Sequence, residues 1–188
     1  MSSSWRSILC DSLEKVFPDT EPRPITTAIA QHVLRGETVA VQVAVHPPVS
    51  PRRLPSDLSV QVDLDRDDVT ARVFAVDLVP ATHLAFDDHD DNYLRDAPGL
   101  YPDLLRPLAE GELLRPFRAG WRSIWIDLTA AEEASAGPVR VGIRLTDTAG
   151  EVVVEERCTV EVVPATLPAL PLVNTHWFHA DGLAQYHR

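Results

Sequence analysis

Apolar and polar residues alternate with a period of two along much of this chain, which is the pattern of β-strands with one buried face. The run 38–45 is the clearest, because its four valines share one face while Ala40, Gln42 and Ala44 share the other. The valines are Val39, Val41, Val43 and Val45. A proline pair after His46 ends the run, since proline has no N–H to donate to a sheet.

Further runs with the same period predict strands over 58–64, 71–79, 123–128, 139–145 and 151–163. The apolar faces expected to point inward are Leu58, Val60, Val62 and Leu64; Ile124, Ile126 and Leu128; Val139, Val141, Ile143 and Leu145; and Val152, Val154, Cys158, Val160 and Val162. A turn sequence at 147–150 joins the last two strands and predicts a hairpin. Glu156 interrupts the final apolar face, which predicts a bulge or a position at the rim.

About seven or eight short alternating strands, few helical signals and 16 prolines predict an all-β fold, an antiparallel β-sandwich over residues 1–163. Residues 11–22 are amphipathic, and we expect one helical turn or a docking arm there. In the segment 164–171 three prolines in eight residues predict a stiff linker. Residues 172–188 then resemble the start of a second domain, the first strand of a (β/α)8 barrel whose remainder is missing.

The long polar segment 80–120 contains the acidic run Asp87, Asp88, Asp90 and Asp91 around His89. These carboxylates could offer oxygen ligands to Ca²⁺, although their spacing departs from the EF-hand loop. The alternative is a solvated acidic loop, and no metal site is predicted from the spacing. The stretch 98–105 is expected to be a turn followed by a packed apolar segment. Its predicted anchors are Leu100, Leu104 and Leu105.

Two tryptophans, Trp121 and Trp125, flank the start of the strand 123–128. Trp125 falls on the face opposite Ile124 and Ile126, so we expect it to cover the sheet from outside or to meet another domain. Aromatic rings at a sandwich surface can also stack on sugars. Packing is the main interpretation for both residues, and sugar stacking is the alternative.

The segment 172–181 places Thr175, Trp177, His179 and Asp181 on one face if it is extended. His179 and Asp181 would then emerge at the carboxyl end of the strand, where (β/α)8 barrels hold their active sites. The alternative is that they are satisfied polar residues in a barrel mouth. His176 points to the other face and cannot share a metal ion with His179 from one strand.

The composition excludes several classes of function but does not identify one. Of the residues, 45% are hydrophobic, and the net charge of −11 argues against nucleic acid or anionic membrane partners. The N-terminus lacks the apolar core of a secretory signal, which predicts a cytoplasmic protein. The two cysteines, Cys10 and Cys158, are expected to be free rather than bridged. No nucleophile elbow, phosphate loop or zinc motif appears, so no catalytic residue and no cofactor is predicted.

Several motifs resemble one family. This family is the group of the domain of unknown function 4091, which is similar to glycoside hydrolase family 123. The resemblance lies in the segments 36–37, 42–45, 91–95, 98–105 and 175–186. The resemblance spans nearly the whole chain. It implies a β-sandwich followed by a (β/α)8 barrel.

The resemblance also implies a retaining β-N-acetylgalactosaminidase, in which the substrate's own 2-acetamido group attacks the anomeric carbon beside an adjacent Asp-Glu pair. No Asp-Glu pair occurs in this chain, so no catalytic residue carries over. The tail, by the same resemblance, would place His179, Asp181 and Trp177 at a sugar subsite.

Three hypotheses follow. The first is a non-catalytic sandwich that supports the downstream barrel of a glycoside hydrolase-like protein. The second is a carbohydrate-binding module with a glycan ligand, and the third is a Ca²⁺- or protein-interaction domain built on the segment 87–91. We also expect that apolar surface at the missing interface could drive dimerisation.

Overall fold

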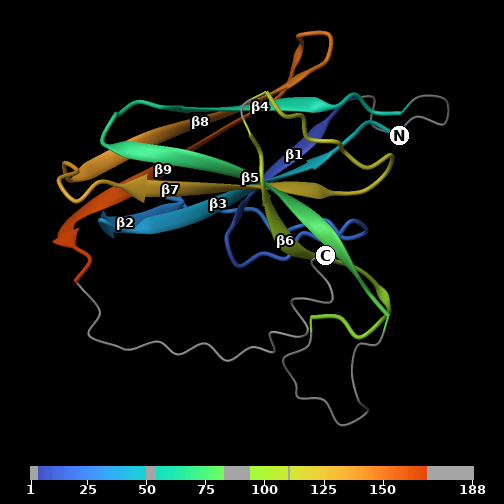
Figure 1. The fold of residues 1–188 in the computed structure, drawn as a ribbon, viewed down its shortest axis with the longest axis horizontal. Helices are drawn as coiled ribbons and strands as arrows, with labels where there is room; N and C mark the ends of the chain where they lie inside the picture. The colour runs from blue at the N-terminus through green and yellow to red at the C-terminus, as the bar shows by residue number, and fades with distance from the viewer. Residues whose placement is uncertain (1–3, 50–53, 83–93, 110, 169–188) are drawn as a thin grey trace, which may run out of the picture.

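Two β-sheets pack face to face in the computed structural model, which describes residues 4–49, 54–82, 94–109 and 111–168 (Figure 1). The five-stranded sheet has the order β1-β3-β7-β5-β6, with β1 Arg6–Asp11, β3 Thr38–His46, β7 Arg122–Ala130, β5 Val69–Ala81 and β6 Gly99–Pro107. The four-stranded sheet has the order β2-β9-β8-β4, with β2 Gln31–Arg35, β9 Val152–Thr166, β8 Gly137–Asp147 and β4 Leu58–Leu64. The predicted all-β sandwich is confirmed.

Neighbouring strands pair antiparallel with one exception in the described residues, the parallel pair of β2 and β9. There Gln31 lies opposite Val160 and Val33 lies opposite Val162. The amide of Leu167 donates to the carbonyl of Arg35 at 2.8 Å, just beyond the end of β9. The last strand is therefore held on both sides, by β2 and by β8.

The core consists of the inward faces that the alternation predicts for β3, β7 and β8. Val43 lies opposite Ile124 and Val41 opposite Ile126 in the five-stranded sheet, and all four side chains are fully buried. Val139, Val141, Ile143 and Leu145 are buried in the other sheet. Burying an aliphatic side chain of this size contributes roughly 1.5–3 kcal/mol, so this shared core is the main source of stability.

The strand β4 has the predicted bounds but a less complete inward face. Leu58 is fully buried, whereas Val60, Val62 and Leu64 are half-buried. The reason is that β4 is the edge strand of its sheet, with β8 on one side only. Its apolar side chains therefore line an open seam of the sandwich instead of the closed core.

The predicted hairpin joins β8 to β9. The Asp147 amide donates to the Glu151 carbonyl at 2.9 Å, and Asp147 Oδ1 accepts from the amides of Ala149 and Glu151. An irregularity between Leu145 and Thr146 pairs Thr146 with Val152, which turns Val152 outward. Val152 is 49% exposed, so its predicted inward position is wrong.

Glu156 lies opposite Ile143 in unbroken register, so the predicted bulge does not fall at this residue; the register shift of the β8–β9 pair lies between Leu145 and Thr146. The carboxylate of Glu156 accepts a hydrogen bond of 2.5 Å from the hydroxyl of Ser7 on β1. That bond links the edge of the five-stranded sheet to β9 and gives the half-buried carboxylate a partner.

Three strands were not predicted: β1, β2 and β6. The strand β6 lies inside the segment 80–120 that was expected to be polar loop, and it pairs with the outer half of β5. Leu100, Leu104 and Leu105 are 48%, 56% and 38% exposed, so their predicted role as packed anchors is wrong. They lie on a two-stranded ribbon, where β6 pairs with β5 beyond the stretch of β5 that pairs with β7.

The first residues form β1 and then an irregular arm that docks on the sheet, which agrees with one alternative for 11–22. Val16, Phe17 and Pro22 are the buried residues of this arm. Phe17 packs edge-on against Tyr101 of β6, and the guanidinium of Arg95 lies 3.9 Å from the centre of the Phe17 ring. The arm therefore covers the outer face of the five-stranded sheet near β3.

The strand β9 continues to Thr166 and takes in the first residues of the expected linker 164–171. The expected start of a barrel, 172–188, lies outside the described residues. Among the residues that the model does describe, no helix is long and apolar enough to cross a membrane.

Candidate binding groove on the outer face of the five-stranded sheet

The outer face of the five-stranded sheet carries Trp125 at its centre. Alternation along β7 turns Ile124 and Ile126 into the core and Trp125 outward, as the sequence predicts. Gln42 of β3 and Phe74 of β5 are its cross-strand neighbours. The indole Nε1 donates to Asp127 Oδ1 at 2.7 Å, and this bond holds the half-buried ring along the strand.

A groove of about 180 Å³ lies over this face. Its floor comes from β3, β5 and β7, one wall is the turn of the N-terminal arm, and the other wall is β6. The lining residues are Ser12, Glu14, Lys15, Gln42, Val76, Pro102, Asp103, Leu105 and Trp125. Residues far apart in the sequence therefore meet at one site.

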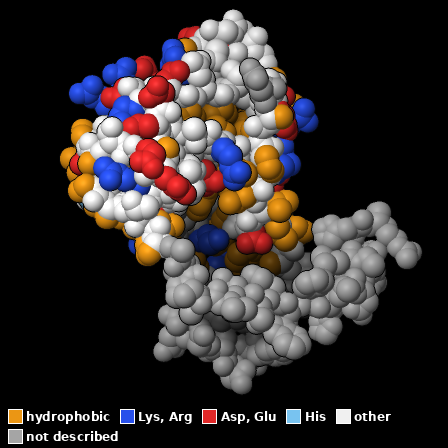
Figure 2. Space-filling view, turned by 60° about the vertical axis from the view of Figure 1, so that its left-hand side comes forward, with side chains coloured by type: hydrophobic (Ala, Val, Ile, Leu, Met, Phe, Trp, Pro, Cys, Tyr) orange, Lys and Arg blue, Asp and Glu red, His pale blue; other side chains and the backbone are white. Residues whose placement is uncertain are grey.

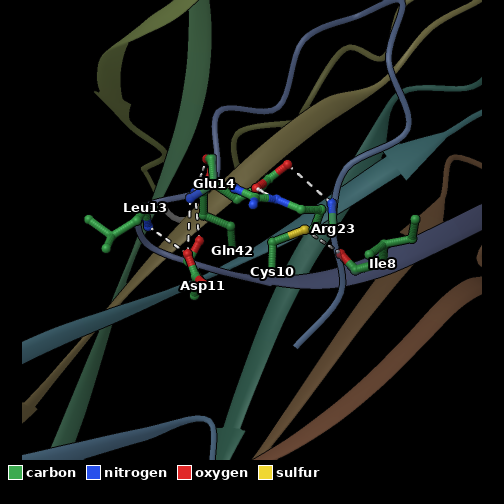
Figure 3. Close-up of polar contacts among 7 residues, drawn as sticks. All are labelled: Ile8, Cys10, Asp11, Leu13, Glu14, Arg23 and Gln42. Carbon is green, nitrogen blue, oxygen red and sulfur yellow. Dashed lines mark hydrogen bonds and ion pairs between the residues drawn. The ribbon is translucent and has the colours of Figure 1, made fainter. Parts of the chain in front are cut away.

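The arm wall is fixed by a closed set of hydrogen bonds (Figure 3). Asp11 Oδ1 accepts from the amides of Leu13 and Glu14 at 2.8 and 3.0 Å, which closes the turn. Gln42 Nε2 donates to the carbonyls of Asp11 and Glu14 at 3.0 and 2.9 Å. The Glu14 carboxylate accepts from the amide and Nε of Arg23 at 3.1 and 2.9 Å.

Gln42 is the centre of this arrangement. It is only 3% exposed, and its Oε1 also accepts from the hydroxyl of Ser123 at 3.0 Å. Both N–H donors of the amide thus hold the turn, and its oxygen accepts one hydrogen bond from the sheet. Gln42 therefore shapes the groove and has little left to offer to a ligand.

Lys15, Asp103 and Ser12 differ from Gln42 and Glu14. Within the described part of the chain, their side chains take part in no hydrogen bond or ion pair. A lysine, an aspartate and a serine with uncommitted side chains therefore line the groove together with Trp125, Val76 and Leu105. Apolar walls with a few uncommitted polar groups are the usual composition of a small-molecule site.

Trp121 lies in a different environment. It is 4% exposed and packs with Cys10, Val16 and Ala44 under the arm. The ring of His46 meets it edge-on at 5.3 Å, and the guanidinium of Arg6 lies 4.9 Å from its centre. Trp121 therefore presents no open ring face to a sugar, and the packing interpretation accounts for it.

A larger cavity of about 560 Å³ lies in the open seam between β4 and β5. It is lined by Ser59, Val60, Ala71, Arg72, Val73, Phe74, Pro107, Leu108, Ala109, Gly111 and Glu112. Its charged groups are already paired, because Arg72 contacts Asp127 at 3.2 Å and Glu112 binds Arg106. The seam is thus chiefly an apolar crevice, and we place the candidate site at the smaller groove.

Both cysteines are free. Burial, followed by the nearby charges of Glu14 and Asp11, raises the pKa of the Cys10 thiol to about 12. Burial and the charge of Glu156 raise the pKa of Cys158 to about 11. Both thiols are therefore protonated at neutral pH, and neither has the character of a nucleophile.

Several candidates from the sequence lie outside the described residues. These are Asp87, Asp88, Asp90, Asp91, Trp177, His179 and Asp181. Across the residues that are described, no three metal-ligating side chains gather. Lys15 and Asp103 were not singled out in the sequence, because nothing in its pattern brings the arm beside β6.

The fold and the groove define this chain as a β-sandwich domain. No family model matches the chain, and no curated protein matches its sequence. Among solved structures, the chain is similar to a family 123 glycoside hydrolase from Clostridium perfringens whose structure describes glycolipid glycan hydrolysis. The two are 10% identical with a TM-score of 0.62, over 88% of this chain and 28% of that chain. This likeness shows the fold.

Cohesins are also similar, at lower TM-scores. The OlpA cohesin of Clostridium thermocellum is 12% identical at 0.35, over 86% of this chain and all of that one. CaCohA2 of Clostridium acetobutylicum is 19% identical at 0.32, over 70% of this chain and 86% of that one. TM-scores this low support no inference about this chain. The chain spans about 28% of the length of the glycoside hydrolase that it matches.

Proposed function

We propose that this chain is the non-catalytic β-sandwich domain of a glycoside hydrolase-like protein, and that it packs against and supports a (β/α)8 barrel. One observation carries the proposal: a fold likeness that takes in 88% of this chain but only 28% of a family 123 enzyme. An accessory domain compared with a larger enzyme that contains a similar domain would match over most of its own length and over a small share of the enzyme. A barrel that acts on N-acetylgalactosaminides belongs to the same proposal.

The β5–β6 ribbon supports this role because it extends beyond the sandwich (Figure 1). Four of its apolar side chains are substantially exposed, namely Val79, Leu100, Leu104 and Leu105. Figure 2 shows acidic and basic side chains interspersed with apolar ones on one face of the molecule. Exposed large apolar side chains on one projecting element fit a surface that another domain covers.

The direct test assays the 188-residue chain against an aryl N-acetylgalactosaminide. We expect a rate equal to that of the blank, since the sequence contains no adjacent Asp-Glu pair of the kind that the resemblance implies for catalysis. Hydrolysis above the blank by the purified chain would refute the non-catalytic role.

The supporting role is tested by the double variant Leu100→Ser, Leu104→Ser, because these two exposed ribbon leucines do not line the groove over Trp125. In the 188-residue chain we expect an unchanged melting temperature, because both side chains are exposed. In the longer polypeptide with its barrel, the same change should lower the melting temperature of the barrel. Leu13→Ser is the matched control, since Leu13 is an exposed leucine of the arm and not of the ribbon. Equal effects of the ribbon and arm variants would contradict the assignment of the ribbon.

A further inference from the structure

We propose that the groove over Trp125 binds one pyranose ring of a glycan, with the indole as its stacking surface. This inference goes beyond the supporting role, because it concerns the sandwich alone and needs no barrel. It rests on the composition of the groove, its size and its fixed walls.

The apolar part of the groove suits the C–H face of a sugar ring. Trp125 forms the floor together with Val76, and Leu105 and Pro102 line the side toward β6. An aromatic side chain supplies a large, flat apolar surface while its polar edge is bonded elsewhere. Here that edge is already satisfied, because Nε1 donates to Asp127. The ring is thus left to act through its apolar surface.

The polar part suits sugar hydroxyls, which both donate and accept hydrogen bonds. Lys15 can only donate, an ionised Asp103 can only accept, and Ser12 can do both. None of the three has a side-chain partner in the described residues, and Lys15 and Asp103 form no ion pair with each other. Hydrogen bonds from charged groups are stronger than neutral ones, so two uncommitted charges favour a hydroxyl-rich ligand.

The size of the groove indicates one ring. Its volume of about 180 Å³ lies below the range of roughly 300–1,000 Å³ that drug-sized ligands occupy. A single sugar residue, free or within a glycan laid across the face, is a ligand that a groove of this size can hold. The rest of a longer glycan would extend into solvent.

The groove is also formed before any ligand arrives. Gln42 holds the arm turn to the sheet through two hydrogen bonds, and Asp127 holds the indole. Ordering loops and side chains on binding costs affinity, so a prearranged site retains more of its contact energy. The larger seam between β4 and β5 lacks this combination, because its charged side chains are already ion-paired.

The test is an NMR titration of the 188-residue chain that follows the indole N–H signal of Trp125. The probes are N-acetylgalactosamine, N-acetylglucosamine, galactose and glucose, and then an oligosaccharide that ends in the best of the four. We expect the Trp125 signal to shift and saturate with at least one sugar. A Trp125 signal that none of the four sugars shifts would overturn the proposal.

Variants separate stacking from general stability. Trp125→Leu keeps an apolar floor but removes both the aromatic face and the indole signal, so its affinity is read from the backbone amide signals of the groove residues. We expect binding about tenfold weaker, the upper end of what an aromatic contact contributes. Trp125→Phe should bind with an intermediate affinity. Lys15→Met and Asp103→Asn should each weaken binding while leaving the amide spectrum unchanged elsewhere. Equal affinity of Trp125→Leu and the parent chain would also overturn the proposal.

The outcome is independent of the supporting role. Loss of sugar binding in Trp125→Leu with an unchanged barrel melting temperature upholds the groove alone. A defect confined to the ribbon variant upholds the interface alone. The two proposals therefore fail separately.

Discussion

Gln42 shows how a single polar residue can hold two layers together. The alternation along β3 places it on the face opposite the valines, and a sheet face without a second layer would leave such a residue in water. The arm covers it instead, and its amide binds two backbone carbonyls and one hydroxyl. Buried polar groups of this kind are costly to leave unpaired, so the amide specifies where the arm docks.

Replacing this amide should therefore loosen the arm. We expect Gln42→Leu to lower the free energy of unfolding by about 2–4 kcal/mol, because Ser123 and the two carbonyls lose their partner. Urea unfolding measures the change. Gln61→Leu is the control, since the exposed Gln61 bonds only to Asp63, and it should stay within about 0.5 kcal/mol of the parent. Equal effects of the two variants would contradict the role of Gln42.

At the scale of elements, sequence alternation predicted the strands whose two faces differ. The bounds of β4 and the inward faces of β3, β7 and β8 were predicted correctly. In these strands every second side chain is buried, so apolar residues recur at every second position of the sequence. The strand β6 was missed for a physical reason. Pro102, Pro107 and the irregularity near Asp103 break its alternation, and both faces of the ribbon carry exposed apolar residues.

The candidate site was predictable only in part. The outward position of Trp125 follows from its neighbours Ile124 and Ile126. The groove needs the arm, β3 and β6 together, and contacts between segments so far apart in sequence leave no local pattern. The arm itself left a weak trace, the apolar residues Val16 and Phe17 within an otherwise polar stretch.

The contact between the arm and the segment before β7 can be tested at Gly120. This glycine has a φ of +130°, and a Cβ built there would lie 2.8 Å from the carbonyl oxygen of Pro18. We expect Gly120→Ala to destabilise the chain by about 2–4 kcal/mol, from backbone strain and from displacement of the arm. Thermal or urea unfolding reports the loss.

Gly99→Ala provides the matched comparison. No heavy atom lies within 4 Å of the Cβ position at Gly99, and its φ is not in the left-handed region. We expect a change within about 0.5 kcal/mol. If Gly120→Ala proved as mild as Gly99→Ala, the close approach of Pro18 would be refuted.

At the scale of the molecule, the sandwich core stabilises the fold without a disulfide bond. Both thiols are free and at least partly buried. The four-stranded sheet contributes Cys158 and the five-stranded sheet contributes Cys10, so a bridge would have joined the two layers. Their association depends instead on aliphatic packing and on links such as the Ser7–Glu156 hydrogen bond.

Thiol chemistry checks this arrangement. With a pKa raised from 9.0 to about 12 at Cys10 and about 11 at Cys158, the thiolate fraction of each near pH 8 falls at least about 100-fold. We expect the folded chain to react with a thiol reagent at least about 100-fold more slowly than the urea-unfolded chain at pH 8, and its rate should keep rising about tenfold per pH unit through pH 9 without levelling off. In the unfolded chain, two thiols should react with the reagent. A melting temperature that falls on addition of reductant would reveal a disulfide and contradict this.

The parallel pairing of β2 with β9 has a mechanical consequence. The chain leaves the sandwich along the axis of β9, and its hydrogen bonds to β2 and β8 lie across that axis. A pull on the chain beyond Leu167 therefore loads both ladders in shear, so that many bonds must yield together instead of opening one at a time. Whatever is attached at that end is tethered through the strongest direction of the sheet.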